Sequence, residues 1–155
     1  MDAQVLELAG RHRLEGELFA AGLEVAYPAR DRGVDLIAYL EVGRTADRFV
    51  AKPIQMKAAS RRSFGVWQKF EKIHDLIFAF VWHLDGVGDP ETYALIYSEA
   101  KAVGNEMDWL GTDSWTIHGG YGTTRPNDEL RERLKPYLMT PERWRAKITG
   151  SLPRP

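Results

Sequence analysis

The sequence predicts a mixed α/β domain in which helices flank a central β-sheet, and three observations support this class. Residues 76–82 (LIFAFVW) form an unbroken apolar run of strand length, which is typical of a strand buried on both faces. Residues 54–58 (IQMKA) alternate apolar and polar side chains, so this strand has one polar face. Residues 3–21 have the length of a helix, and Gly22 closes them as a stop.

The other elements follow in order from β-branched, turn and capping residues. Along the chain we expect a short apolar segment at 23–27, a turn at 30–33, a strand at 34–40, a second turn at 43–47, a strand at 49–58, a weakly helical segment at 66–74, a strand at 93–97, a helix from 98 to about 110, a last strand at 114–118, and helices at 127–138 and from 140 onward. Pro53 indicates an edge position or a bulge for its strand. Residues 119–122 (GGYG) indicate a tight turn.

The length and composition predict one domain without disulfides. A chain of 155 residues is long enough for one hydrophobic core and too short for two domains. We place the core at about residues 1–97 and a C-terminal helical extension at about 98–147. The absence of cysteine excludes disulfides, thiolate metal sites and cysteine nucleophiles, and we expect a cytoplasmic protein. No segment has the pattern of a signal peptide or a membrane span.

The charge is divided unevenly along the chain. The formal net charge is −1, but residues 52–72 carry six basic side chains against Glu71 alone. A basic segment of this kind can contact the phosphates of a nucleic acid, or it can be a solvated helix face. Charge alone leaves both interpretations open.

Polar side chains interrupt two of the predicted strands. Gln55 and Lys57 lie on the same face of one strand, and Asp35 lies inside the apolar strand before it. Leaving a buried polar group unpaired costs roughly 1–3 kcal/mol, so these groups need partners. If the two strands are neighbours, the three side chains form either a buried Asp35–Lys57 ion pair with Gln55 beside it, or a functional site.

These residues resemble a known nuclease family. Residues 33–39 (GVDLIAY), followed by 53–60 (PIQMKAAS), resemble the active-site strands of the PD-(D/E)XK superfamily of restriction-endonuclease-like enzymes. An upstream helix with a glutamate, ending in residues 22–25 (GLEV), is similar to the start of that core. The resemblance covers about residues 1–85. It implies a restriction-endonuclease-like core and a metal-dependent nuclease, with DNA expected before RNA and a homodimer suited to double-strand cleavage.

The resemblance also implies roles for single residues. Asp35 becomes the principal ligand of Mg²⁺ or Mn²⁺, with Gln55, Glu15 and the backbone carbonyl of Met56, and Lys57 positions or activates the attacking water. In such a site the metal neutralises charge on the phosphate and orients that water. Four basic residues are expected to contact flanking phosphates: Arg61, Arg62, Lys69 and Lys72.

The sequence departs from the family pattern at Gln55, where most members have Asp or Glu. An amide oxygen brings no charge, so a metal bound here would have one negatively charged ligand fewer than in most members of the family. The alternative is therefore a catalytically inactive relative that binds nucleic acid or another partner.

Glu15 is the residue that we expect to compensate for the missing charge. At about 100° per residue, Glu15 shares a helix face with Leu8, Leu18 and Phe19, while Glu17 points to the opposite side. Glu15 could instead pair with Arg11 on the surface, four residues earlier.

Overall fold

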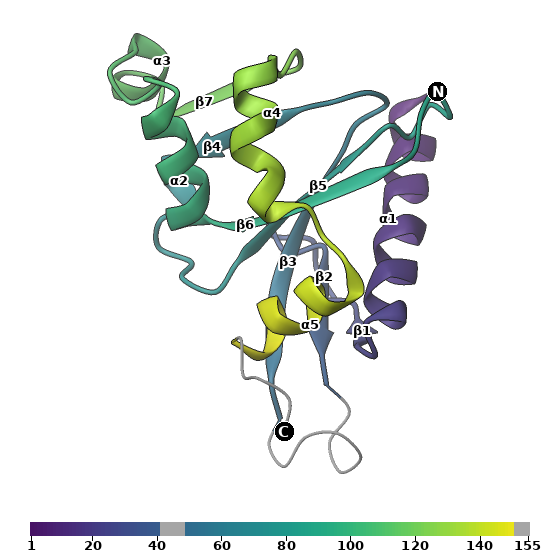
Figure 1. The fold of residues 1–155 in the computed structure, drawn as a ribbon. Helices are drawn as coiled ribbons and strands as arrows, with labels where there is room; N and C mark the ends of the chain where they lie inside the picture. Colours follow the sequence, from purple (N-terminus) through teal and green to yellow (C-terminus); the bar gives the residue numbers. More distant parts are fainter. Residues whose placement is uncertain (41–48, 151–155) are drawn as a thin grey trace.

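The computed structural model describes residues 1–40 and 49–150. The predicted α/β class is confirmed, with helices on both faces of a five-stranded sheet (Figure 1). In chain order the elements are α1 (Ala3–Ala20), β1 (Glu24–Ala26), β2 (Leu36–Tyr39), β3 (Ala51–Ala58), β4 (Phe64–Trp67), η1 (Gln68–Phe70), β5 (Ile77–Trp82), β6 (Glu91–Ile96), α2 (Tyr97–Glu106), α3 (Asp113–Thr116), β7 (Gly120–Thr123), α4 (Asp128–Leu134), η2 (Lys135–Tyr137) and α5 (Pro141–Thr149).

The sheet has the strand order β1-β2-β3-β5-β6, and β4 pairs with β7 in a separate two-stranded ribbon. Neighbouring strands are antiparallel except for β3 and β5, which are parallel. Each face of the sheet has its own apolar core. Helices α1 and α5 contribute to one core, while α2, α4 and the β4–β7 ribbon contribute to the other.

Strand β5 separates the two cores. All six of its residues are buried, as the unbroken apolar run predicted. Phe78, Phe80 and Trp82 belong to the core under α2 and α4, whereas Ile77 and Val81 belong to the core under α1 and α5. Alternate side chains of a strand point to opposite faces, so this one segment supplies both cores.

Helix α1 has the bounds that its sequence predicted to within one residue. The Asp2 carboxylate caps it by accepting from two backbone N–H groups of the first turn, and Gly22 follows its end with a φ of +76°. Gly10 brings the helix close to β3, because a Cβ there would lie 2.8 Å from the Ala58 Cβ. The N-terminal half of α1 is therefore held against the end of β3.

The β4–β7 ribbon differs from what the sequence predicted. Residues 66–74 contain the end of β4 and the short 3-10 helix η1 in place of a longer helix, 114–118 contain α3 and not a strand, and 119–122 lie largely in β7 and not in a tight turn. The glycines of the ribbon explain the difference. A Cβ on Gly65 or Gly120 would come within 2.5 Å of the Trp67 ring, so glycine is required here by close packing.

Pro53 does not mark an edge strand, because β3 lies between β2 and β5. Its pairing partner in β2 is Ile37, and pairing with β5 begins only at Ile54. Pro53 thus precedes the part of β3 that bonds to β5, where its missing N–H removes no ladder bond.

The C-terminal helices begin where their capping residues predicted. The side chains of Asn127 and Thr140 accept from the backbone N–H groups of Leu130 and Arg143. The turn expected at 43–47 lies outside the described residues. Among the residues that the structure describes, no helix is long and apolar enough to span a membrane.

Candidate active site

A cavity of about 770 Å³ lies where β3 extends beyond the first residue of β2. Leu36, at the start of β2, pairs with Ile54, but β3 continues alongside β5 to Ala58. This difference in length leaves a notch at the edge of β3. Side chains from α1, from the turn before β2, from β3 and from η1 meet there: Glu7, Asp31, Asp35, Gln55, Lys57 and Lys69.

Asp35 closes the notch from the β2 side. Its backbone N–H donates to the Ile54 carbonyl at 2.9 Å, and its Oδ2 accepts from the Met56 N–H at 2.6 Å. Burial raises the pKa of the Asp35 carboxyl, and the nearby carboxylates of Asp31 and Glu7 raise it further. The Met56 hydrogen bond and the Lys57 charge oppose this rise without cancelling it. A carboxylate in this setting gains from a positively charged partner.

Gln55 and Lys57 face the cavity, as their alternation in β3 predicted. The Gln55 Oε1 atom is buried and has no hydrogen-bond partner among residues 1–40 and 49–150. Lys57 forms no ion pair with Asp35 within 4.0 Å, so the two side chains are not the buried ion pair that the sequence also allowed. The Lys57 Nζ atom lies instead 5.6 Å from the centre of the Trp67 ring. In the described part of the chain the site therefore contains a carboxylate that is hydrogen-bonded to Met56 but has no ion-pair partner, an amide oxygen without a hydrogen-bond partner, and an ammonium group.

Glu7, and not Glu15, is the glutamate of α1 that lines the cavity. The helix face predicted from Leu8 and Phe19 is wrong, because these side chains are 51% and 55% exposed. The buried side of α1 contains Leu14 and Leu18. Glu7 precedes them by seven and eleven residues, which places it within about 20° of both. That spacing is the sequence signal that could have identified Glu7.

The surface pair between Arg11 and Glu15, which the sequence also allowed, is not formed. Arg11 donates to Glu7 at 3.0 Å and not to Glu15. The Glu7 side chain is 57% exposed, so this pair lies at the rim of the cavity.

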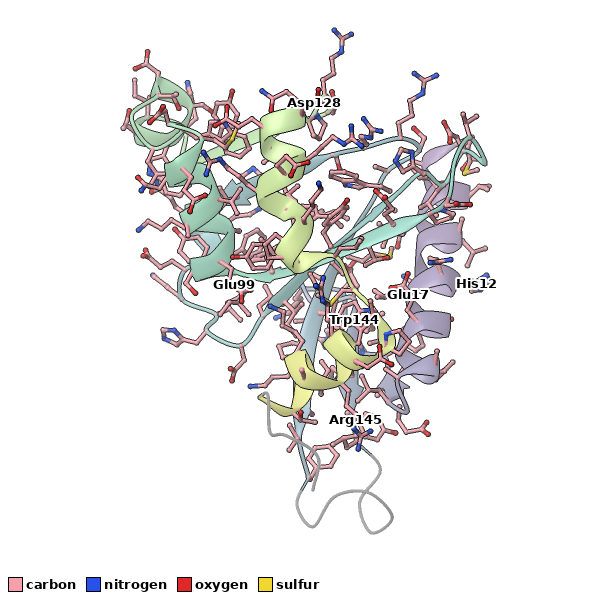
Figure 2. All side chains as sticks on the ribbon, viewed as in Figure 1. His12, Glu17, Glu99, Asp128, Trp144 and Arg145 are labelled. Atoms are coloured by element: carbon pink, nitrogen blue, oxygen red, sulfur yellow. The ribbon has the colours of Figure 1, made fainter. Side chains whose placement is uncertain are left out.

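Glu17 does not point away from the sheet, as the helical projection had suggested. Its carboxylate accepts from Arg13 at 2.7 Å, from the Thr92 hydroxyl at 2.8 Å and from the Trp144 indole N–H at 3.0 Å. Figure 2 shows Glu17 and Trp144 side by side between α1 and α5. Glu17 thus ties three elements together at a distance from the cavity.

The four predicted phosphate contacts are placed differently from one another. Lys69 lines the cavity. Arg61 pairs with Asp85 at 3.6 Å, and Arg62 donates to His83 at 3.4 Å, both beyond the end of β3. Lys72 is exposed outside the cavity. Arg32, in the turn before Asp35, lines the cavity and was missed, although its place beside the Asp35 segment was a signal for it.

The donor atoms of the site suit a hard divalent cation. Mg²⁺ and Mn²⁺ prefer carboxylate, amide and carbonyl oxygens, which Glu7, Asp35 and Gln55 supply. The Met56 carbonyl lies on the β2 side of β3, because the N–H of the same residue donates to Asp35. Within residues 1–40 and 49–150 no cluster of three or more His, Cys, Asp or Glu side chains has metal-binding geometry. A metal here would therefore depend on the uncharged oxygens, and the unpartnered Gln55 oxygen fits that need.

Comparisons with known proteins do not assign the chain to a family. No family model matches it, and neither a curated protein nor a solved structure matches it. The resemblance of residues 33–39 and 53–60 to the PD-(D/E)XK superfamily stays a prediction.

Proposed function

We propose that this protein is a divalent-metal-dependent nuclease that hydrolyses phosphodiester bonds, with DNA as its substrate. The observation that carries the proposal is the convergence of Asp35, Gln55, Lys57 and Glu7 on one open cavity. Two of these groups, Asp35 and the Gln55 amide oxygen, are buried to an extent that favours a cationic partner. At such positions an apolar side chain of similar volume would often stabilise the fold as well or better. Polar side chains there therefore favour a role in binding or catalysis.

The side chains of the site have separate tasks in this proposal. Asp35, Glu7, Gln55 and the Met56 carbonyl would hold Mg²⁺ or Mn²⁺, which would lower the pKa of a bound water and offset charge on the phosphate. The Lys57 ammonium lines the same cavity, and no carboxylate of the described residues forms an ion pair with it. In this proposal it would hold the phosphate or the attacking water as a point charge. Lys69 and Arg32, also in the lining, add positive charge for the flanking backbone.

Incubation with defined nucleic acids tests the proposal. The substrates are supercoiled plasmid, linear duplex, single-stranded and branched DNA, and RNA, each with Mg²⁺, with Mn²⁺ or with chelator. We expect metal-dependent cleavage of DNA. Binding without cleavage in any metal would favour a catalytically inactive nucleic-acid-binding module, and an absence of both binding and cleavage would overturn the proposal.

Gln55→Glu is expected to strengthen metal binding and weaken the metal-free fold. The new carboxylate adds a charged ligand, and affinity at oxygen-ligand sites follows the number of charged ligands, so we expect about a tenfold gain in Mg²⁺ affinity. Without metal, the same charge would repel Asp35 and Glu7, and the melting temperature should fall. Titration calorimetry with Mg²⁺ and Mn²⁺, together with thermal melting, measures both effects. Unchanged affinity for both metals would mean that Gln55 is not a ligand.

A further inference from the structure

A second cavity of about 310 Å³ adjoins the proposed catalytic cavity. The two share Lys57 and Ser63 in their linings. The second cavity is otherwise apolar and aromatic, with hydroxyl groups at one side: its remaining lining residues are Phe64, Trp67, Phe80, Gly122, Thr123 and Thr124. An apolar pocket with a few polar groups is the usual form of a site for a flat organic group.

Trp67 forms a platform in this second cavity. Its indole lies across the glycine face of the β4–β7 ribbon, since Cβ atoms on Gly65 and Gly120 would lie 2.5 Å and 2.4 Å from ring atoms. One face of the ring is thus occupied by backbone. The Lys57 ammonium lies over the ring, and the Trp67 side chain lines the cavity and remains partly exposed. Three glycines, at 65, 120 and 122, make this arrangement possible in a ribbon of only four paired residues per strand.

Lys57 connects the platform to the proposed chemistry. Its ammonium borders both cavities and lies 5.6 Å from the Trp67 ring centre. A nucleotide bound with its phosphate beside Lys57 in the first cavity would therefore have its base within reach of Trp67 in the second. Bases stack on aromatic side chains without regard to sequence, because every base has a π-face.

We propose that the second cavity binds an unpaired nucleobase next to the scissile phosphate, with Trp67 as the stacking surface. This inference rests on the proposed nuclease function and specifies its substrate. A base inside a duplex is stacked on both sides and cannot present a face to Trp67. The preferred substrates are therefore single strands, frayed ends or branched DNA, and intact duplex binds more weakly.

Binding measurements without cleavage test this inference. Fluorescence anisotropy in chelator compares a labelled single strand, the same strand with one to three central abasic sites, and the matching duplex. Trp67→Ala is expected to weaken single-strand binding about 5- to 150-fold, the range that corresponds to a stacking contribution of 1–3 kcal/mol. Trp67→Phe should restore most of the affinity. Duplex binding should change little, and the abasic sites should reproduce the loss in the unmodified protein.

A pair of glycine variants provides a matched control. Gly120→Ala places a Cβ 2.4 Å from the Trp67 ring and must displace the indole, whereas a Cβ on Gly111, which lines neither cavity, meets nothing within 4 Å. Gly120→Ala should therefore weaken single-strand binding as Trp67→Ala does, and Gly111→Ala should not. Thermal melting checks that each variant is folded. Equal affinity of folded Trp67→Ala and unmodified protein for the single strand would overturn the inference.

The same assays separate this inference from the proposed function. Metal-dependent cleavage that is unaffected by Trp67→Ala, in a variant that also binds single strands normally, would support the nuclease function and rule out the base site. Trp67-dependent binding of single strands without cleavage in any metal would retain the base site and remove the nuclease.

Discussion

Asp35→Asn is expected to reduce DNA cleavage by about 10²–10³-fold, a loss of the size caused by removing one preorganised electrostatic group from an active site. The substitution keeps the volume of the side chain and leaves an oxygen that can accept from the Met56 N–H. The loss would therefore report the missing charge and not a damaged fold. Single-turnover cleavage of the preferred substrate at saturating Mg²⁺ measures it.

The same substitution has an opposite effect on stability. The pKa of Asp35 is raised in the folded state, first by burial, so its charged form is disfavoured by the fold. A raised carboxyl pKa contributes stability that is present below the unfolded value and is lost as pH rises through the folded value. At neutral pH in chelator, Asp35→Asn should thus melt at or above the temperature of the unmodified protein. The difference should shrink as pH falls toward about 4.

Asp31→Asn is the matched control for Asp35. Asp31 lines the same cavity and raises the pKa of Asp35, but its carboxylate caps the Gly33 N–H in the exposed turn. We expect cleavage by Asp31→Asn to remain close to that of the unmodified protein. A folded Asp35→Asn variant that cleaves at the normal rate would remove Asp35 from the site.

Glu7→Gln is expected to lower metal affinity and cleavage about 10- to 100-fold, whereas Glu15→Gln leaves both unchanged. Glu7 lines the cavity and its charge acts on Asp35, while Glu15 lies outside the cavity lining. The cost to folding should be small, because the exposed Glu7–Arg11 pair contributes about 0.3–0.5 kcal/mol. Mg²⁺-induced change in melting temperature and the cleavage rate are measured together.

Arg11→Gln distinguishes the carboxylate from the ion pair. It removes the same 3.0 Å pair and leaves the Glu7 carboxylate in place. Cleavage by Arg11→Gln should stay near normal if Glu7 acts as a ligand. If Glu7→Gln and Arg11→Gln lose cleavage activity equally, Glu7 has only a structural role.

The regular parts of the fold were predictable because their signals are local. The apolar run of β5 is buried on both faces, the alternation in β3 separates Gln55 and Lys57 from the core residues beside them, and Asp2 and Gly22 bracket α1. Each signal depends on backbone periodicity or on capping of backbone groups, which neighbouring residues alone decide. The sequence by itself therefore determined the α/β class and brought Asp35, Gln55 and Lys57 under consideration together.

Only the tertiary structure decided which helix residues reach the site. Leu8 and Phe19 suggested one buried face of α1, but the sheet packs on the side of Gly10 and Leu14. A helix with apolar residues on several sides has no single buried face until its partners are in place. The partners here are α5, whose Trp144 binds the Glu17 carboxylate, and β3, which Gly10 approaches closely.

The β4–β7 ribbon was likewise decided by a long-range contact. Glycine-rich residues 119–122 indicate a turn when only neighbours are considered, yet they pair with β4, more than fifty residues earlier. The glycines serve the Trp67 indole, which occupies the space where their side chains would lie. A requirement for empty space arises only when two distant segments meet, and no local pattern in the sequence records it.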